Sequence, residues 1–83
     1  MRITVTTVQG DVTPNMKEYA EKKLSKIKKF FASGMLDARI QLSIEHPWCN
    51  AEAIITVKNS GNMVAKAKSD DMYKAVDAMM DKL

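Results

Sequence analysis

The sequence predicts an α+β protein with two layers, a four-stranded mixed sheet with two helices on one face. Its 83 residues are enough for one small domain. Its composition, 46% hydrophobic and 28% charged, is that of an ordinary globular protein. The spacing of the apolar residues switches between the periods of strands and helices in the order β-α-β-β-β-α. The segment between the first two strands is long enough for a parallel crossover, and both helices need the apolar face of the sheet.

The first predicted strand and helix occupy residues 2–8 and 14–32. Residues 2–8 alternate apolar and hydroxyl side chains and are rich in β-branched residues, which favours a half-buried strand. Thr13 is placed to cap the helix, and Pro14 to occupy its first position. Gly34 can supply the left-handed residue just past the helix end. Apolar residues at spacings of three and four form the predicted core stripe: Met16, Ala20, Leu24, Ile27 and Phe31.

The rest of the chain predicts a three-stranded antiparallel meander followed by a second helix. Residues 37–45, 51–58 and 63–68 alternate apolar and polar side chains, so each strand covers a core on one side only. Residues 46–50 break this pattern, and residues 59–62 are a tight-turn signal. Ser69, Asp70 and Asp71 are predicted to provide a cap and two acidic residues in the first helical turn. The apolar stripe of this helix contains Met72, Val76, Met79, Met80 and Leu83.

The positive charge of the chain is concentrated in the first predicted helix. Residues 14–32 contain six lysines and two acidic residues, whereas the whole chain has a net charge of only +3. Lys17 and Lys28 fall on one flank of a helical wheel. The other flank holds four lysines within about 120°: Lys22, Lys23, Lys26 and Lys29. Two interpretations stay open here, a solvated basic face that keeps the domain soluble and a ridge that contacts nucleic-acid phosphates.

Two single residues depart from the general pattern. Lys23 falls inside the apolar arc of its helix, beside Tyr19, so its ammonium group is expected to reach outward through the groove between the two helices. Trp48 lies in the segment that breaks the strand pattern. It is either an exposed platform for a nucleic-acid base or a lid on the sheet edge, and the sequence leaves both interpretations open.

The sequence predicts no catalytic site, metal site or cofactor. His46 and Cys49 are three residues apart, but two ligands do not make a zinc site, and no second cluster supplies the others. The acidic residues are dispersed, and the chain has no glycine-rich phosphate loop. One cysteine cannot form an internal disulfide, and no apolar run could cross a bilayer or serve as a signal peptide. We therefore expect a cytoplasmic protein without a membrane or small-molecule partner.

Three stretches of the chain resemble one known family. Residues 21–31, EKKLSKIKKFF, are similar to E-x-K-L-x-K-L-x-K-Y/F-F. Residues 65–67 and 71–77, AKA and DMYKAVD, are similar to A-x-A…D-M-Y-x-A-I-D, the most specific of the three patterns. The ending, residues 80–83, MDKL, is similar to I-D-K-L. They resemble the ribosome hibernation promoting factor family, also called ribosome-associated inhibitor or protein Y, and the resemblance extends over essentially the whole chain.

The resemblance implies a non-enzymatic ribosome hibernation factor. Such a factor would bind the small ribosomal subunit in the path of messenger and transfer RNA and inhibit translation under stress or in stationary phase. Family members continue past the position of Leu83 with a basic helix end, and some add a domain that pairs ribosomes. Residues 1–83 are therefore expected to be a single ribosome-binding domain that lacks a C-terminal part, with its oligomeric state open. The lysines expected to contact ribosomal RNA are Lys22, Lys23, Lys26, Lys29 and Lys82.

Two other function classes are weaker matches to the sequence. A general double-stranded-RNA-binding module also has two helices on one face of a sheet, but it normally begins with a helix and has lysines at the start of its last helix. Here that helix opens with Asp70 and Asp71, which would repel phosphates. A small α+β enzyme of the acylphosphatase type would need an anion-binding loop and an Arg-Asn pair near the first strand, and neither is evident.

Overall fold

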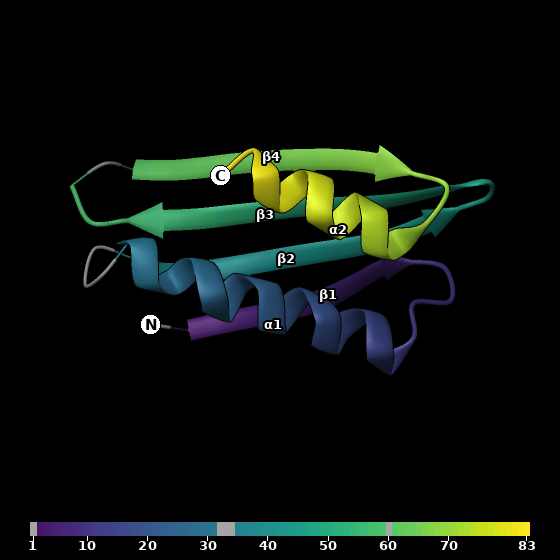
Figure 1. Ribbon diagram of the computed structural model, residues 1–83, viewed down its shortest axis with the longest axis horizontal. Coiled ribbons are helices and arrows are strands. Elements are labelled where there is room, and N and C mark those ends of the chain that lie inside the picture. The colour runs from purple at the N-terminus through teal and green to yellow at the C-terminus, as the bar shows by residue number, and fades with distance from the viewer. Residues whose placement is uncertain (1, 32–34, 60) are drawn as a thin grey trace.

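Four strands and two helices follow one another in the predicted order (Figure 1). The computed structural model describes residues 2–31, 35–59 and 61–83, except for the side chains at 27–31 and 35–36. No helix in the described part of the chain is long and apolar enough to span a membrane. The elements are β1 (Arg2–Gln9), α1 (Pro14–Phe31), β2 (Met35–Glu45), β3 (Trp48–Val57), β4 (Gly61–Ser69) and α2 (Met72–Asp81).

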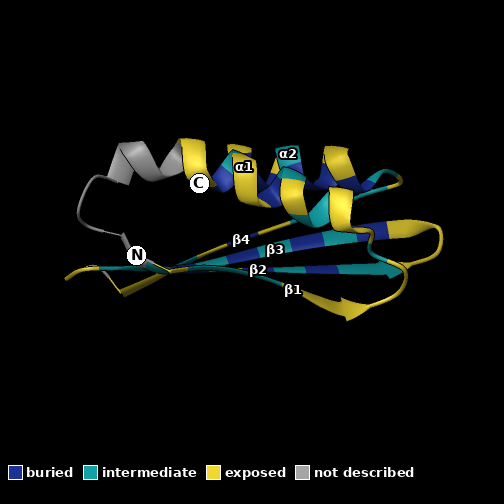
Figure 2. Ribbon diagram, turned by 90° about the horizontal axis from the view of Figure 1, so that it is seen from below, coloured by how far each residue is buried: buried dark blue, intermediate teal, exposed yellow. Residues whose placement is uncertain are grey.

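The strands form one sheet in the order β1-β2-β3-β4. β1 is parallel to β2, and the two other pairings are antiparallel, so the predicted crossover and meander are both confirmed. Figure 2 shows α1 and α2 side by side on the same face of the sheet. The predicted fold class, a two-layer α+β protein, is confirmed.

The core lies between the helices and one face of the sheet. Alternation along β2 turns Ala38, Ile40 and Leu42 inward, each with none of its surface exposed. The helices meet them with apolar stripes that agree with the predicted spacing, including fully buried Leu24 of α1 and Met79 of α2. Among the described residues, none of the buried ones is polar or charged. Hydrophobic burial therefore holds the helices on the sheet.

Both helices begin at capped positions, but the second cap differs from the prediction. Thr13 caps α1 as expected, because its hydroxyl accepts a hydrogen bond of 3.2 Å from the backbone N–H of Met16. In α2 the cap is Asp71 itself. Its carboxylate accepts bonds from the backbone N–H groups of Tyr73, at 2.7 Å, and Lys74, at 3.3 Å. The prediction of two acidic residues inside the first turn was wrong, since the helix starts at Met72, after both of them.

The third strand is longer than predicted. Residues 46–50 were expected to break the strand pattern, yet Trp48 pairs with Glu45 and Cys49 pairs with Ile44, so only His46 and Pro47 form the turn. Buried Cys49 continues the inward-facing positions of β3. The alternation was hidden because Trp48 and Cys49 are both apolar residue types, although only Cys49 faces the core. The predicted helix end at Gly34 lies outside the described residues.

Candidate nucleic-acid interface

Three of the predicted lysines gather on one flank of α1. Lys22, Lys23 and Lys26 line a hollow of about 480 Å³ beside the helix, together with Tyr19, Ser25 and two acidic residues, Glu18 and Glu21. Lys22 and Lys26 are exposed and Lys23 is half-buried. Positions separated by one helical turn lie on the same side of a helix, which is why Lys22 and Lys26 are neighbours in space. The flank therefore presents flexible ammonium groups to solvent from a rigid backbone.

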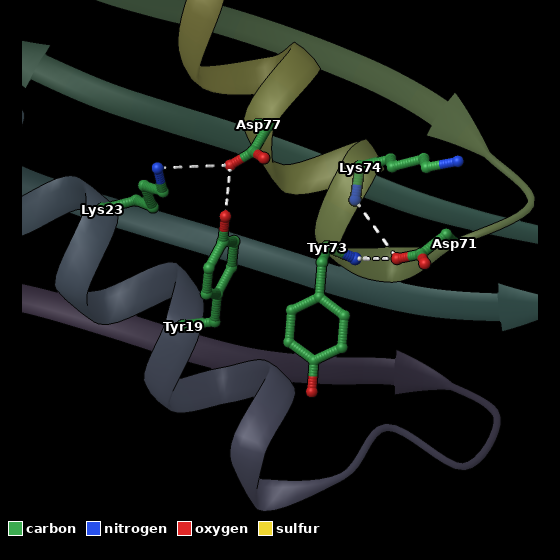
Figure 3. Close-up of polar contacts among 6 residues, drawn as sticks. All are labelled: Tyr19, Lys23, Asp71, Tyr73, Lys74 and Asp77. Carbon is green, nitrogen blue, oxygen red and sulfur yellow. Dashed lines mark hydrogen bonds and ion pairs between the residues drawn. The ribbon is translucent and has the colours of Figure 1, made fainter.

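Lys23 reaches into the groove between the helices, as its place on the wheel predicts. Its ammonium nitrogen lies 3.5 Å from an Asp77 carboxylate oxygen on α2 and 5.4 Å from the centre of the Tyr19 ring (Figure 3). The Tyr19 hydroxyl donates a hydrogen bond of 2.7 Å to the same carboxylate oxygen. Asp77 therefore joins two side chains of α1 to α2.

The electrostatics of this cluster favour a neutral Tyr19 phenol and a charged Lys23 ammonium group. The hydrogen bond that Tyr19 donates to Asp77, then burial, and then the charge of Asp77 raise the pKa of the phenol. The carboxylate of Asp77 is also the main cause that raises the pKa of Lys23. Lys23 thus remains an ammonium ion, but the nearby Asp77 carboxylate partly neutralises its charge. Because solvent screens such partly exposed pairs, they add little to stability.

An aromatic contact reinforces the junction between the helices. The rings of Tyr19 and Tyr73 meet edge to face, with centroids 5.0 Å apart and an interplanar angle of 84°. This geometry is favourable for aromatic quadrupoles. Asp77 and Tyr73 lie four residues apart on one side of α2, and their pairing with α1 was missed in the sequence. The four-residue spacing of Tyr73 and Asp77 indicates that they share one side of α2, but it does not indicate which residues of α1 they contact.

Of the two other predicted lysines, only Lys82 can be placed, and it lies apart from this cluster. The side chain of Lys29 lies outside the described residues. Lys82 follows α2, and its ammonium group donates a hydrogen bond to the backbone carbonyl of Lys66 on β4. It lines a different hollow, next to the strands rather than to α1. Lys82 therefore does not belong to the patch formed by Lys22, Lys23 and Lys26.

The His46 and Cys49 pair does not form a reactive centre here. His46 is exposed in the turn, whereas Cys49 is buried. Burial, followed by the charges of Asp71 and Asp70, raises the pKa of the Cys49 thiol and disfavours the nucleophilic thiolate. Among the described residues, no group of three or more His, Cys, Asp or Glu side chains is placed to hold a metal ion.

Comparison with known proteins identifies the family. The model of the family described as sigma 54 modulation protein / S30EA ribosomal protein matches residues 3–83. The chain belongs to this family. Two relatives in the S30EA family are 34% identical over all 83 residues of this chain. They are a ribosome hibernation promoting factor of Klebsiella oxytoca, of which 85% is covered, and a ribosome-associated factor Y of Haemophilus influenzae, of which 76% is covered.

Solved structures of S30EA relatives have the same fold. A ribosomal subunit interface protein from Coxiella burnetii superposes with a TM-score of 0.85 and 32% identity, covering 99% of this chain and 88% of that one. The N-terminal domain of Thermus thermophilus protein Y superposes with a TM-score of 0.82 and 25% identity, covering 99% and 90%. The resemblance to ribosome hibernation promoting factors and protein Y, expected from three motifs, is thereby confirmed.

Proposed function

We propose that the chain is a non-enzymatic ribosome hibernation factor that acts in the cytoplasm. In this proposal residues 1–83 form one binding domain, which occupies the messenger and transfer RNA path of the small subunit and stops translation. The observation that carries it is the convergence of Lys22, Lys23 and Lys26 on one flank of α1. Membership in the S30EA family, with relatives named for the ribosome, points the same way.

The lysine flank suits a folded RNA better than a small molecule. Ammonium groups on flexible stems can each contact a phosphate and release a condensed counterion, which makes binding favourable but sensitive to salt. The α1 backbone holds these groups at fixed spacing on a rigid layer, so they can match a phosphate arrangement that is itself fixed by RNA tertiary structure. In the proposal the bound domain fills the space that tRNA and mRNA would occupy on the small subunit, so neither can bind.

Sedimentation with purified ribosomal subunits tests the binding directly. We expect the chain to pellet with the small subunit and not with the large subunit alone. Four phosphate contacts would give a plot of log affinity against log salt a slope of roughly −3 to −4. A flat salt response would contradict phosphate binding by the lysines, and pelleting only with the large subunit would contradict the proposed location.

Competition with initiator tRNA tests occlusion separately from binding. If the domain fills the tRNA path, it should displace initiator tRNA from the small subunit and suppress cell-free protein synthesis in proportion to its occupancy. Nucleotides and acyl phosphates should remain unchanged throughout, since no reaction is proposed. A ternary complex in which the chain and tRNA are bound together, with translation unaffected, would overturn occlusion.

Replacing Asp77 by asparagine should strengthen ribosome binding. The substitution removes the carboxylate that lies 3.5 Å from the Lys23 ammonium group, while an amide oxygen can still accept the Tyr19 hydroxyl bond. Lys23 is then free to contact phosphate, so the salt slope should become steeper by about one. Asp81→Asn, an equal charge change at an exposed residue of the same helix, is the matched control. Equal effects of the two variants would show that only net charge matters.

The structure offers little support for a general double-stranded-RNA-binding module. The first element is strand β1 rather than a helix, and Asp71 occupies the cap of α2, where such modules place lysines. Asp70 beside it is exposed. A carboxylate at this position would face the phosphates of a duplex.

A further inference from the structure

Figure 2 shows that neither α1 nor α2 covers the opposite face of the sheet, which is called the open face below. Because side chains alternate along a strand, Lys66 and Lys68 of β4 lie on the side opposite Ala65, which is buried in the core. Asn50 and Glu52 of β3, their direct partners across the ladder, share that open face. This surface is separate from the α1 flank, which belongs to the other layer.

Trp48 stands at the edge of this open face. It begins β3, and 45% of its surface is exposed. The Lys68 ammonium nitrogen lies 5.1 Å from the centre of its ring system. The Trp48 ring is therefore an exposed aromatic plane beside a cation. A cation–π contact in water is weaker than the stacking of a nucleic-acid base on an aromatic ring, so a base can displace Lys68 from the ring.

A shallow hollow of about 570 Å³ lies on the sheet, and one of the residues that line it is Lys68, whose ammonium group contacts Trp48. Its lining includes Gln41, Ser43 and Asn50, which can donate and accept hydrogen bonds, and the ammonium-bearing residues Lys68 and Lys82. Glu45 is opposite Trp48 in the ladder and Glu52 pairs with Lys66 at 3.2 Å, which leaves a modest positive excess. Among the described residues, neither Lys68 nor Lys82 forms an ion pair with a carboxylate.

We propose that this open face binds single-stranded RNA, with one unpaired base stacked on Trp48 and the adjoining phosphates on Lys68 and Lys82. An aromatic plane, neighbouring amide and hydroxyl groups, and ammonium groups next to them are the combination by which sheets bind unpaired nucleotides. A duplex cannot use it, because its bases are already stacked on one another. An acidic peptide could form ion pairs with the lysines, but its carboxylates would not stack on the Trp48 ring.

The site goes beyond the proposed function and does not depend on it. The lysines of α1 would contact folded RNA from the helix layer, while the Trp48 face would hold an unpaired strand on the opposite layer. A domain with both surfaces could bridge two RNA segments. The two surfaces can be tested apart, since ribosome pelleting reports on α1 and a free oligonucleotide reports on Trp48.

Fluorescence of Trp48, the single tryptophan of the chain, gives the primary test. A short single-stranded oligoribonucleotide should quench it in a saturable way, whereas the same RNA annealed to its complement should not. An abasic ribose-phosphate chain of equal length supplies the phosphates without bases, and a polyglutamate peptide supplies the charge of an acidic protein. Either of these giving equal quenching would overturn base stacking, as would the absence of quenching by the single strand.

Variants measured with labelled RNA assign the contacts. Trp48→Leu should weaken binding about 5- to 140-fold, which corresponds to about 1–3 kcal/mol, and Trp48→Phe should retain most of the affinity. Lys68→Gln should weaken binding and lower the salt slope, while Lys58→Gln, an equal charge change in the turn at the far end of β3, should not. Loss of RNA binding in Lys22→Gln/Lys26→Gln with no loss in Lys68→Gln would place the strand on α1 and overturn the proposal.

Discussion

Reversing the charges of Lys22 and Lys26 together should weaken binding to the small subunit by about a hundredfold or more. A hydrogen bond to a charged group contributes about 1.5–3 kcal/mol, which is tenfold or more for each lysine. Both side chains are exposed and line the same hollow, so the double change Lys22→Glu/Lys26→Glu removes two contacts and introduces repulsion. The measurement is the dissociation constant of a labelled chain with purified subunits at several salt concentrations.

The matched control for this variant carries the same change in net charge elsewhere. Lys17 lies earlier on α1, outside the residues that line the hollow, and Lys58 lies in the turn after β3. Lys17→Glu/Lys58→Glu should therefore reduce affinity far less, and only Lys22→Glu/Lys26→Glu should lower the salt slope by about two. Equal losses in both variants would mean that the ribosome senses bulk charge, and the specific lysine flank would have to be abandoned.

Shortening Leu24 to alanine should have the largest effect on stability. Leu24 has none of its surface exposed and joins α1 to the core. Leu→Ala changes at such positions cost about 2–5 kcal/mol, a large part of the total stability of a small domain. The melting temperature should fall by about 8 °C or more, as measured by circular dichroism.

The neighbouring residue supplies the control for Leu24. Ser25 is exposed on the same turn of α1, so Ser25→Ala should change the free energy of unfolding by no more than about 0.5 kcal/mol. Well below its melting temperature, Leu24→Ala should still bind ribosomes, because the lysine flank remains. An unchanged melting temperature for Leu24→Ala would contradict the packing of α1 on the sheet.

The fold was largely predictable because each element carries its own local signal. Alternation in β2, the Thr13 and Pro14 helix start and the stripe from Met72 to Met80 each specify one kind of backbone and one buried face. The start of β3 was mispredicted because Trp48 and Cys49 do not show the alternation of apolar and polar residues. The start of α2 was mispredicted because Asp71 is itself the helix cap. Boundaries of this kind depend on pairing with β2 and on cap geometry, which local composition does not encode.

The candidate site was predictable only in part, for a different reason. A helical wheel places Lys22, Lys23 and Lys26 on one flank, and the structure brings them together. The wheel cannot show that Asp77 contacts Lys23, because that contact joins residues 54 positions apart on two packed helices. The contact of the Lys68 ammonium group with the Trp48 ring could not be predicted either, since it depends on the register of β3 and β4.

The first part of α1, residues 14–26, and α2 are attached to the core to different degrees, which affects how the domain behaves away from its partner. Over residues 14–26, α1 buries two residues, Ala20 and Leu24, whereas the shorter α2 buries five. Local opening is therefore expected to start in residues 14–26 of α1, which carry Lys22, Lys23 and Lys26. A partner that binds only the closed form opposes this opening, by about 2.7 kcal/mol at a hundred times its dissociation constant. The ribosome would thus protect this helix from proteases, and chains left without a ribosome would be degraded first.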